Sequence, residues 1–401
     1  MLAFGGARSS AWSELKRWLS ARCGVMDPMV TSARDSSAGT PSLINWDLAA
    51  STAARLAPPG PALSAGEIGK AVENLRFNAD VSVPHVHDIT GLDAARDLRD
   101  SHVLVVDRAS WSKANTQSFS VMLQPALQKM LEHRHGSSMS PAAANASGAI
   151  TGSQLGAILA FLSSKVLGQY DPFAAMAPGS NVPPGGRLLL VAPNIISVER
   201  ELNVHPDDFR LWVCLHEQTH RVQFAAAPWL RHHMLEEIEK LSTHLLGNMD
   251  SLVERASAVA KSLKDRTASG NVPGRGAILD LLQDPEEKAA ISHITAVMSL
   301  LEGHANVVMD AVDSSIVPSV KTIRQRFNDR GKDRGIIEKF IRNILGLDAK
   351  MRQYTDGAKF VRGVVDVAGM DGFNKVWDHA GNLPTEEEIH DSKLWLERMG
   401  L

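Results

Sequence analysis

Two histidines and a glutamate in the middle of the chain have the residue types and spacing of a metal-dependent hydrolytic site. His216, Glu217 and His220 form the pattern His-Glu-x-x-His. On an α-helix, residues i and i+4 lie one turn apart on the same face, so both imidazoles can reach one metal ion at about 2.0–2.1 Å. Glu217 lies about 100° further round the helix. From there its carboxylate can take a proton from a water molecule that the metal activates.

A hydrolytic zinc site needs a third protein ligand and an open fourth position. The metzincin pattern would continue with a glycine and a third histidine, but this chain has Gln223 and Ala226 at those positions, which excludes that class. The preferred candidate is Glu302, whose neighbours include Val297 and Leu301. A carboxylate in such an apolar setting must be paired or bound to a metal.

Alternatives to these assignments remain open at this point. Glu302 could instead pair with a buried arginine, and His304 competes as the third ligand, although it lies about 200° away on the same helix. Asn306, four residues after Glu302, could accept the outer N–H of a ligand histidine and fix its tautomer. The His-Glu-x-x-His pattern could also lie on a surface helix with two solvated histidines, but the surrounding residues are too apolar for an exposed helix.

The candidate residues must be positioned by helices, and the sequence predicts two of them. Pro206, followed by two aspartates, supplies the start of a helix whose apolar pattern covers Phe209–Phe224. Glu302 lies in a second long helical pattern over Pro285–Val312, which begins with a proline.

The remaining segments predict a mainly α (α+β) fold with a small sheet in the first half. Helices are expected over Ala50–Leu56 (capped by Asn45 or Asp47), Ala65–Ala79 and Ile158–Val166, and strands over Val103–Val106 and Arg187–Val191. Three segments are expected to be irregular: Gly136–Gly152 as a flexible connection or lid, Gly168–Asp171 as a turn, and Arg324–Arg334 as a solvated basic loop.

Composition excludes several classes of protein. The 401 residues include 42 basic and 45 acidic side chains, a net charge of -3, whereas a generic nucleic-acid-binding domain is strongly basic. No run of about 18 apolar residues predicts a membrane span. Two cysteines, Cys23 and Cys214, are too few for a disulfide framework, and Cys214 is expected in the core on the far side of the metal helix. We therefore expect a soluble, cytoplasmic protein.

Two motifs, His216–His220 (HEQTH) and Glu302–Asn306 (EGHAN), resemble those of a zincin-like family of uncharacterised bacterial proteins regarded as hydrolases. The name of that family links it to deazaflavin-coenzyme biosynthesis. Further segments carry the same resemblance from about residue 44 to the end: Ile44–Asp47, Val106–Arg108 with Trp111, Leu167–Asp171, Ala192–Ile195, Gln353-Tyr354 with Gly357 and Phe360, and Leu383–Thr385 with Glu388 and Trp395.

The resemblance implies a zincin-like metalloprotease fold that holds one zinc ion per chain. His216, His220 and Glu302 would be its ligands, and Glu217 the catalytic carboxylate. Gluzincin peptidases usually have an aspartate four residues after the ligand glutamate, where this chain has Asn306. We expect residues 1–40 to be a disordered or flexible N-terminal extension, or an over-long start. Residues 41–401 are expected to form the zincin-like domain, with a helical part and short strands over 41–200 and a helical metal-binding part over 201–401.

Zincin hydrolases commonly stabilise the oxyanion with a tyrosine, histidine or arginine. Of the two tyrosines, Tyr354 lies in the family-like C-terminal part and is the candidate transition-state donor; the alternative is a core tyrosine with a satisfied hydroxyl. The expected function is zinc-dependent hydrolysis of a peptide or small amide-like substrate, without nucleic-acid or membrane partners. The competing hypotheses are a catalytically silent, zinc-stabilised binding or scaffold protein and a small-molecule metallohydrolase in coenzyme metabolism.

Overall fold

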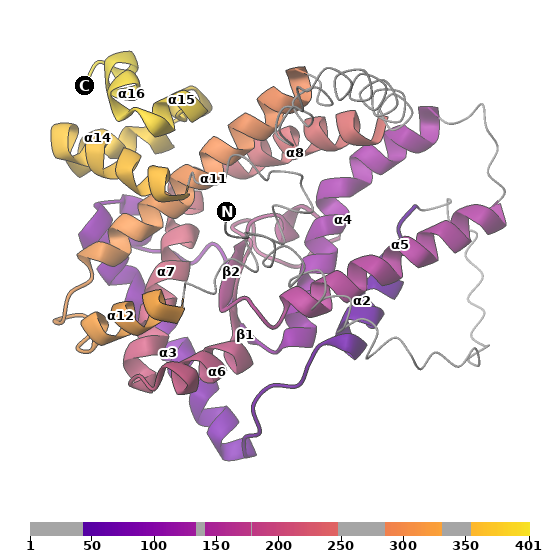
Figure 1. The fold of residues 1–401 in the computed structure, drawn as a ribbon, viewed down its shortest axis with the longest axis horizontal. Coiled ribbons are helices and arrows are strands. Elements are labelled where there is room, and N and C mark those ends of the chain that lie inside the picture. Colours follow the sequence, from indigo (N-terminus) through magenta and orange to yellow (C-terminus); the bar gives the residue numbers. More distant parts are fainter. Residues whose placement is uncertain (1–42, 134–140, 178, 248–284, 331–353) are drawn as a thin grey trace, which may run out of the picture.

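The computed structural model describes residues 43–133, 141–177, 179–247, 285–330 and 354–401 (Figure 1). The expected flexible extension over 1–40 lies outside these residues. Helices predominate, and they are α2 Trp46–Leu56, α3 Ala65–Thr90, α4 Arg108–His133, α5 Pro141–Leu162, α6 Ala192–Leu202, α7 Pro206–Ala226, α8 Leu230–Gly247, α11 Pro285–Ala311, α12 Val320–Arg330, α14 Tyr354–Asn374, α15 Glu386–His390 and α16 Ser392–Met399. Among these described helices, none combines the length and the apolar composition that crossing a lipid bilayer requires.

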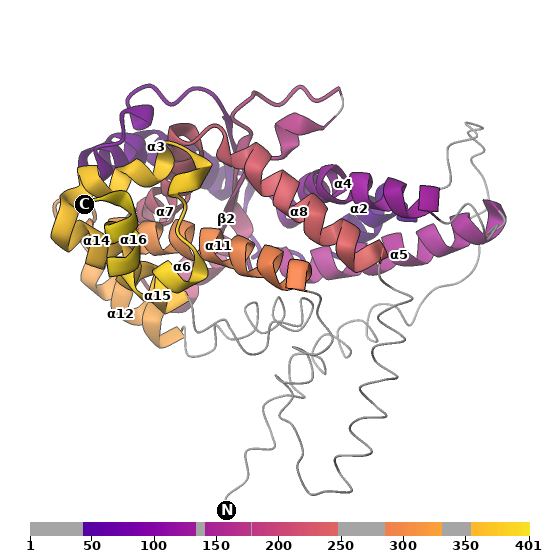
Figure 2. The same ribbon diagram turned by 90° about the horizontal axis from the view of Figure 1, so that it is seen from above.

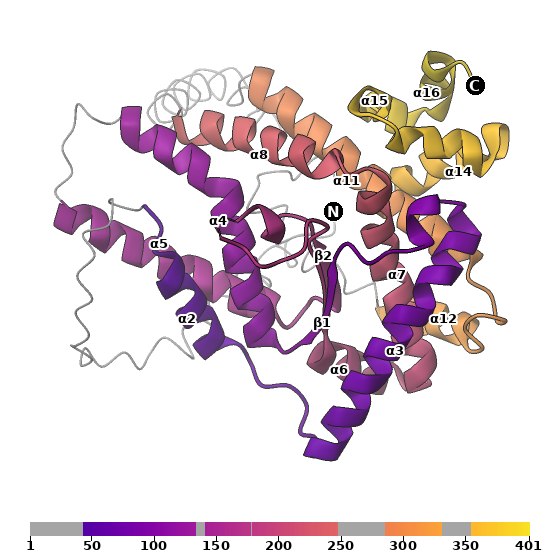
Figure 3. The same ribbon diagram turned by 180° about the vertical axis from the view of Figure 1, so that it is seen from behind.

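Three short strands form one sheet in the order β1-β3-β2, with bounds β1 His102–Val106, β2 Gly168–Asp171 and β3 Arg187–Val191. β1 runs parallel to β3 with Leu104 opposite Leu189, and β2 runs antiparallel to β3 with Gly168 opposite Leu190. The sheet lies between α7 and α4 (Figures 1 and 3). All five residues of β3 are buried because helices cover both faces of this central strand.

A buried ion pair fastens β2 and β3 to α4. The guanidinium of Arg187 on β3 donates from Nε to Asp171 Oδ2 on β2 at 3.0 Å and from Nη2 to the carbonyl oxygen of Ala114 on α4 at 2.8 Å. Ser118 on α4 also donates to Asp171, at 2.6 Å. Because both charges are hydrogen-bonded as well as paired, the cost of their burial is offset. The position of β2 is therefore fixed relative to α4.

The Ser/Ala/Gly-rich segment that we expected to be a flexible connection or lid is helical from Pro141 onward, as part of α5. The prediction for Gly136–Gly152 is therefore wrong over 141–152, and residues 136–140 lie outside the described part. The small residues serve close packing against α2. A Cβ atom on Gly152 would lie 2.4 Å from the carbonyl oxygen of Asn45, and one on Gly156 would lie 2.5 Å from that of Ala49. Alanine also has the highest helix propensity, which favours the helix over a loop.

Other predictions of local structure were confirmed or need correction. The strand over Arg187–Val191 is confirmed, and the strand expected at Val103 begins one residue earlier. Gly168–Asp171 is the strand β2 rather than a turn, because it pairs with β3. The first part of the expected basic loop, up to Arg330, belongs to α12, and residues 331–334 lie outside the described part.

Helix α11, which carries Glu302, is packed between a helix from the middle of the chain and one from the C-terminal part. α11 packs against α7 on one side and against α14 on another (Figures 1 and 2). At the contact with α14, two glycines face each other. A Cβ atom on Gly303 would lie 2.2 Å from the carbonyl carbon of Gly357, and one on Gly357 would lie 2.0 Å from the carbonyl oxygen of Ser299. The two helix backbones can approach this closely only without side chains there.

Replacing Gly303 with alanine should force α11 and α14 apart. We expect the free energy of unfolding of Gly303→Ala, measured by denaturant titration, to fall by roughly 1–3 kcal/mol, as for other overpacked interiors. Gly69→Ala is the control, since a Cβ atom on Gly69, in helix α3, would meet nothing within 4 Å.

The control should gain up to about 1 kcal/mol, because alanine is the better helix former at an exposed position. Equal effects of the two substitutions would show that the glycine contact does not set the spacing of α11 and α14.

Candidate metal centre

Three side chains from two helices converge on one point. His216 and His220 on α7 and Glu302 on α11 each offer one ligand atom, and these atoms lie within 4.8 Å of one another. The two histidine Nε2 atoms are 3.3 Å apart, and the imidazole rings are nearly perpendicular, at 87°. Glu302 Oε1 lies 3.7 Å from Nε2 of His220, and Oε2 lies 4.0 Å from Nε2 of His216.

These separations fit a tetrahedral zinc ion. Two nitrogens that each lie about 2.0–2.1 Å from zinc at a tetrahedral angle are about 3.3–3.4 Å apart, which matches the distance between the two histidine nitrogens. The carboxylate oxygens are a few tenths of an ångström further away, within the reach of a rotation of the Glu302 side chain. Two histidines and a glutamate are also the donor set of hydrolytic zinc sites that keep one position open.

The face of α7 opposite the histidines anchors the helix in the core. Leu215 and Cys214 are fully buried there, and the Cys214 Sγ atom lies 3.8 Å from the carbonyl oxygen of Leu75 on α3. Burial raises the pKa of the Cys214 thiol, so it stays protonated. The expectation that Cys214 is a core residue on the far side of the metal helix is confirmed.

Glu302 faces the histidines although its neighbours are buried. Leu300, Leu301 and Val297 pack into the core, while Glu302 keeps about a third of its side chain exposed. His304, the competing third ligand, is fully buried instead, with its ring against Phe373 and Trp377. Burial, with a smaller effect of His220, lowers the pKa of His304 to about 3, so this imidazole is neutral. The structure thus brings Glu302, and not His304, into the group of ligand atoms.

Glu217 lies buried beside the three candidate ligands. Burial, with a smaller contribution from the nearby carboxylate of Glu302, raises the pKa of Glu217 to about 8 in the metal-free protein. The first residue of β2 lies directly on this side chain: a Cβ atom on Gly168 would lie 2.6 Å from Glu217 Cγ and Cδ. A glycine at this position therefore leaves the room that the Glu217 carboxylate occupies.

A cavity of about 480 Å³ opens onto the site. It reaches His216, Glu217 and Glu302, and its other walls are an apolar group and a polar group of residues. The apolar group is Val166, Leu167, Trp212, Val213, Met309 and Phe327, and the polar group is Asn306, Asp310, Arg324 and Asn328. Arg324 on α12 donates to the carbonyl oxygens of Met309, Asp310 and Val312 at the end of α11, so it closes this end of the cavity rather than lying in a solvated loop.

The other candidate residues from the sequence lie at different places. Asn306 is exposed and lines the cavity beside Glu302. Tyr354 is the first residue of α14, but its side chain lies outside the described part of the chain.

Two residues near the site were missed by the sequence analysis as contributors to it. Gln223 was considered only as a departure from the metzincin pattern, yet its Oε1 lies 3.0 Å from Nδ1 of the candidate ligand His220. Its position three residues after His220, on the same face of the helix, is the signal that would have found it. Gly168 was assigned to a turn. The only signal that it lies near the site was its place in a segment that resembles the zincin-like family.

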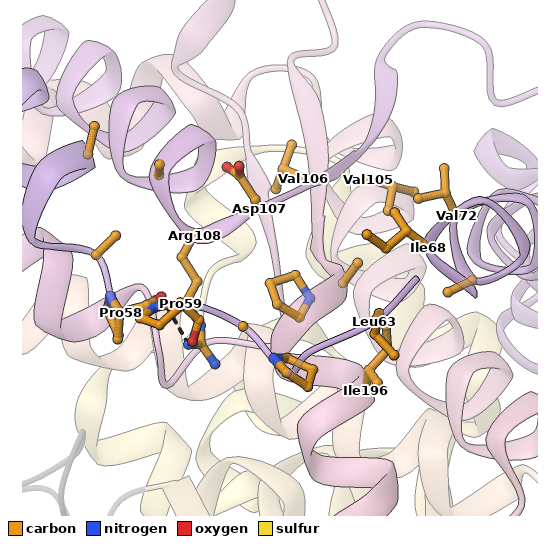
Figure 4. Close-up of a pocket in the computed structure, with 18 residues that line it drawn as sticks. Pro58, Pro59, Leu63, Ile68, Val72, Val105, Val106, Asp107, Arg108 and Ile196 are labelled. Carbon is orange, nitrogen blue, oxygen red and sulfur yellow. Dashed lines mark hydrogen bonds between the residues drawn. The ribbon is translucent and has the colours of Figure 1, made fainter. Parts of the chain in front are cut away.

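A second cavity, of about 430 Å³, lies where β1 and β3 end and α4 and α6 begin (Figure 4). Most of its walls are apolar, including Leu63, Ile68, Val72, Val105 and Ile196. Arg108 donates to the carbonyl oxygens of Pro58 and Pro59 and to Asn194, which ties the proline-rich segment to α6. Two of the family-like segments, around Arg108 and Asn194, therefore shape this second cavity and not the metal centre.

The raised pKa of Glu217 predicts how the stability of the metal-free protein depends on pH. The folded state holds the proton up to about pH 8, whereas the unfolded chain releases it near the ordinary value of 4.5. The free energy of unfolding should therefore fall as pH rises from about 4.5 to 8 and level off above that, by at most about 5 kcal/mol. Denaturant titrations at several pH values, with chelator present, measure this slope.

Glu217→Gln should remove that contribution, because the amide stays neutral at every pH. The exposed Glu387→Gln is the control and should keep the slope of the wild type. A wild-type slope that survives in Glu217→Gln would contradict the assignment of the raised pKa to this side chain.

Comparisons with known proteins identify the family of this chain. A family model described as zincin-like metallopeptidase matches residues 44–396. No curated protein matches the chain. A crystal structure from Chloroflexus aurantiacus, described as that of a candidate hydrolase with a novel fold, is 30% identical in sequence with a TM-score of 0.61, and the match covers 89% of this chain and 99% of that one. Since the family model spans most of the chain, the resemblance noted in the sequence is confirmed, and the chain belongs to the zincin-like metallopeptidase family.

Proposed function

We propose that this protein is a zinc-dependent hydrolase of the gluzincin type that cleaves a peptide or amide bond. The observation that carries the proposal is the convergence of His216, His220 and Glu302 beside the buried carboxyl group of Glu217, at the floor of a cavity. Membership of the zincin-like family and the similarity to a candidate hydrolase support the same class of reaction.

The two histidines and Glu302 would hold the zinc ion through Nε2, Nε2 and one carboxylate oxygen. A zinc ion with such ligands polarises a carbonyl group and makes a water molecule nucleophilic near neutral pH. Glu217 would be ionised more readily beside such an ion, in opposition to the burial that favours its protonated form.

Glu217 would act as the general base and then as the general acid. Its carboxylate accepts a proton from the attacking water and returns that proton to the leaving nitrogen. Gly168 leaves room for the Glu217 carboxylate to act in this way, because a side chain at position 168 would occupy the place of that carboxylate. Tyr354, at the start of the helix that braces α11, remains our proposed donor to the oxyanion.

The walls of the cavity favour a substrate with an apolar side chain next to the bond that is cleaved. Trp212 and Phe327 pack edge to face at a centroid distance of 4.8 Å and form an aromatic wall near His216. β2 is an edge strand whose first residue, Gly168, lines the same cavity. An extended peptide could pair with such an edge through its main chain, which supports a peptide as the substrate.

A small-molecule amide is the second candidate substrate, and the volume of the cavity favours it. About 480 Å³ lies within the range of pockets that bind small molecules. Hydrolysis of N-acyl amino acids but not of longer peptides would favour this substrate class over peptides.

The metal content of the purified protein tests the proposed centre. We expect about one zinc ion per chain by mass spectrometry, lost in His216→Ala and in Glu302→Ala because each removes one of three protein ligands. His205→Ala, an exposed histidine at the start of the same helix, is the control and should keep the metal. Retention of zinc in both ligand variants would contradict the proposed site.

Glu217→Gln tests the reaction separately from metal binding. We expect this variant to keep zinc and to lose turnover by a factor of about 10²–10⁴, the typical contribution of a general base. The measurement is hydrolysis of a panel of peptides and amides with apolar side chains. A wild type that holds zinc but cleaves nothing in the panel would favour a zinc-stabilised scaffold over a hydrolase.

A further inference from the structure

A buried amide links one candidate ligand on α7 to the helix that carries another. Gln223 Oε1 lies 3.0 Å from Nδ1 of His220, and its Nε2 lies 2.8 Å from the carbonyl oxygen of Leu301 and 3.0 Å from Nδ1 of His304. Gln223 and His304 are both fully buried. Leu301 directly precedes Glu302, so the amide reaches the backbone beside the third candidate ligand.

The Leu301 carbonyl fixes the orientation of the Gln223 amide. A carbonyl oxygen can only accept a hydrogen bond, so the amide nitrogen must face it. The reverse orientation would place two oxygen atoms 2.8 Å apart with no proton between them. The amide oxygen must therefore face His220, and the second amide proton points at Nδ1 of His304.

The tautomer of His220 follows from this orientation. Because Gln223 Oε1 can only accept, Nδ1 of His220 must carry the proton and donate it. A neutral imidazole with its proton on Nδ1 has a free lone pair on Nε2, the atom that faces His216 and Glu302. In the other tautomer the proton on Nε2 would occupy the direction from which a metal binds.

We propose that Gln223 is a positioning residue that selects the metal-binding tautomer of His220 and links α7 to α11 next to Glu302. The proposal rests on the metal centre of the proposed function. A single buried amide would then control both the proton on one ligand and the spacing between the two ligand helices. Outer hydrogen-bond partners of ligand histidines are usually carboxylates, backbone carbonyls or water; here a neutral side chain takes this place and adds no charge to the site.

The tautomer can be measured directly in the metal-free protein. With ¹⁵N-labelled histidine at a pH well above the ordinary histidine pKa of about 6.5, long-range ¹⁵N–¹H correlation spectra show which ring nitrogen carries the proton. The spectrum of His220→Ala assigns the signals. We expect the proton on Nδ1 of His220 in the wild type and a shift toward Nε2–H in Gln223→Leu, which has no oxygen to accept from Nδ1.

Metal affinity gives the second measurement, by competition for zinc with a chromophoric chelator. We expect Gln223→Leu to bind zinc about 10–100-fold more weakly, the typical loss when an outer hydrogen-bond partner of a ligand is removed. Gln218→Leu is the matched control: Gln218 is equally buried on the same helix, but its amide donates to the carbonyl oxygen of Ala79 on α3. The control should lose stability while its affinity for zinc stays close to that of the wild type.

Two results would overturn the proposal: a proton on Nε2 of His220 in the metal-free wild type, or equal losses of zinc affinity in Gln223→Leu and Gln218→Leu. The wild-type spectrum needs no substitution at Gln223, so the test stands even if a variant does not fold. A wild type that binds no zinc but carries the proton on Nδ1 would refute the proposed metal centre and leave the hydrogen-bond assignment intact.

Discussion

The crossing of α7 and α11 is the constraint on which the candidate site depends. Two histidines of one helix can form half of a metal centre alone, but the third ligand atom must come from a second helix and arrive within a few ångströms. Apolar side chains on both helices form this contact, and the glycine pair lets α14 pack closely against another side of α11. The Gln223 amide then fixes how α7 and α11 are aligned, through its hydrogen bonds to His220 and to the carbonyl oxygen of Leu301. These hydrogen bonds lie directly beside Glu302 and His220, two of the candidate ligands.

The small sheet contributes to the site through one strand. β2 has only four residues, yet its first residue lines the cavity and lies against the carboxyl group of Glu217. Its position is held by pairing with β3 and by the buried pair between Asp171 and Arg187, which are anchored on α4. Burying a charged pair between two strands costs free energy, but the pair specifies one arrangement when all its hydrogen bonds are satisfied. The strand β2 is thus held by α4, on the face of the sheet opposite the candidate site.

The sequence predicted the parts of the site that depend on local spacing. The histidines and Glu217 follow from helical periodicity, and Glu302 followed from a carboxylate among apolar residues together with the resemblance to the zincin-like family. The strand over Arg187–Val191 was recognisable from its continuous apolar run. Gly168 and the partners of Gln223 were not predictable, because they depend on which segments meet in space: Gln223 and Leu301 are 78 positions apart. The first part of helix α5, up to Gly152, was mistaken for a flexible connection because small residues that permit close packing have the same composition as flexible linkers.

The contact between Gly303 and Gly357 also bears on the order in which the protein matures. A chain is made from its N-terminus, so α7 with both histidines is complete well before α14 exists. Until α14 has been made and has docked on α11, nothing at that contact holds Glu302 at its working depth. Because metal binding and folding are coupled, the proposed centre would bind zinc tightly only after this docking step. A nascent chain that stalls before α14 would present two histidines without their braced partner, and so would compete poorly for scarce metal.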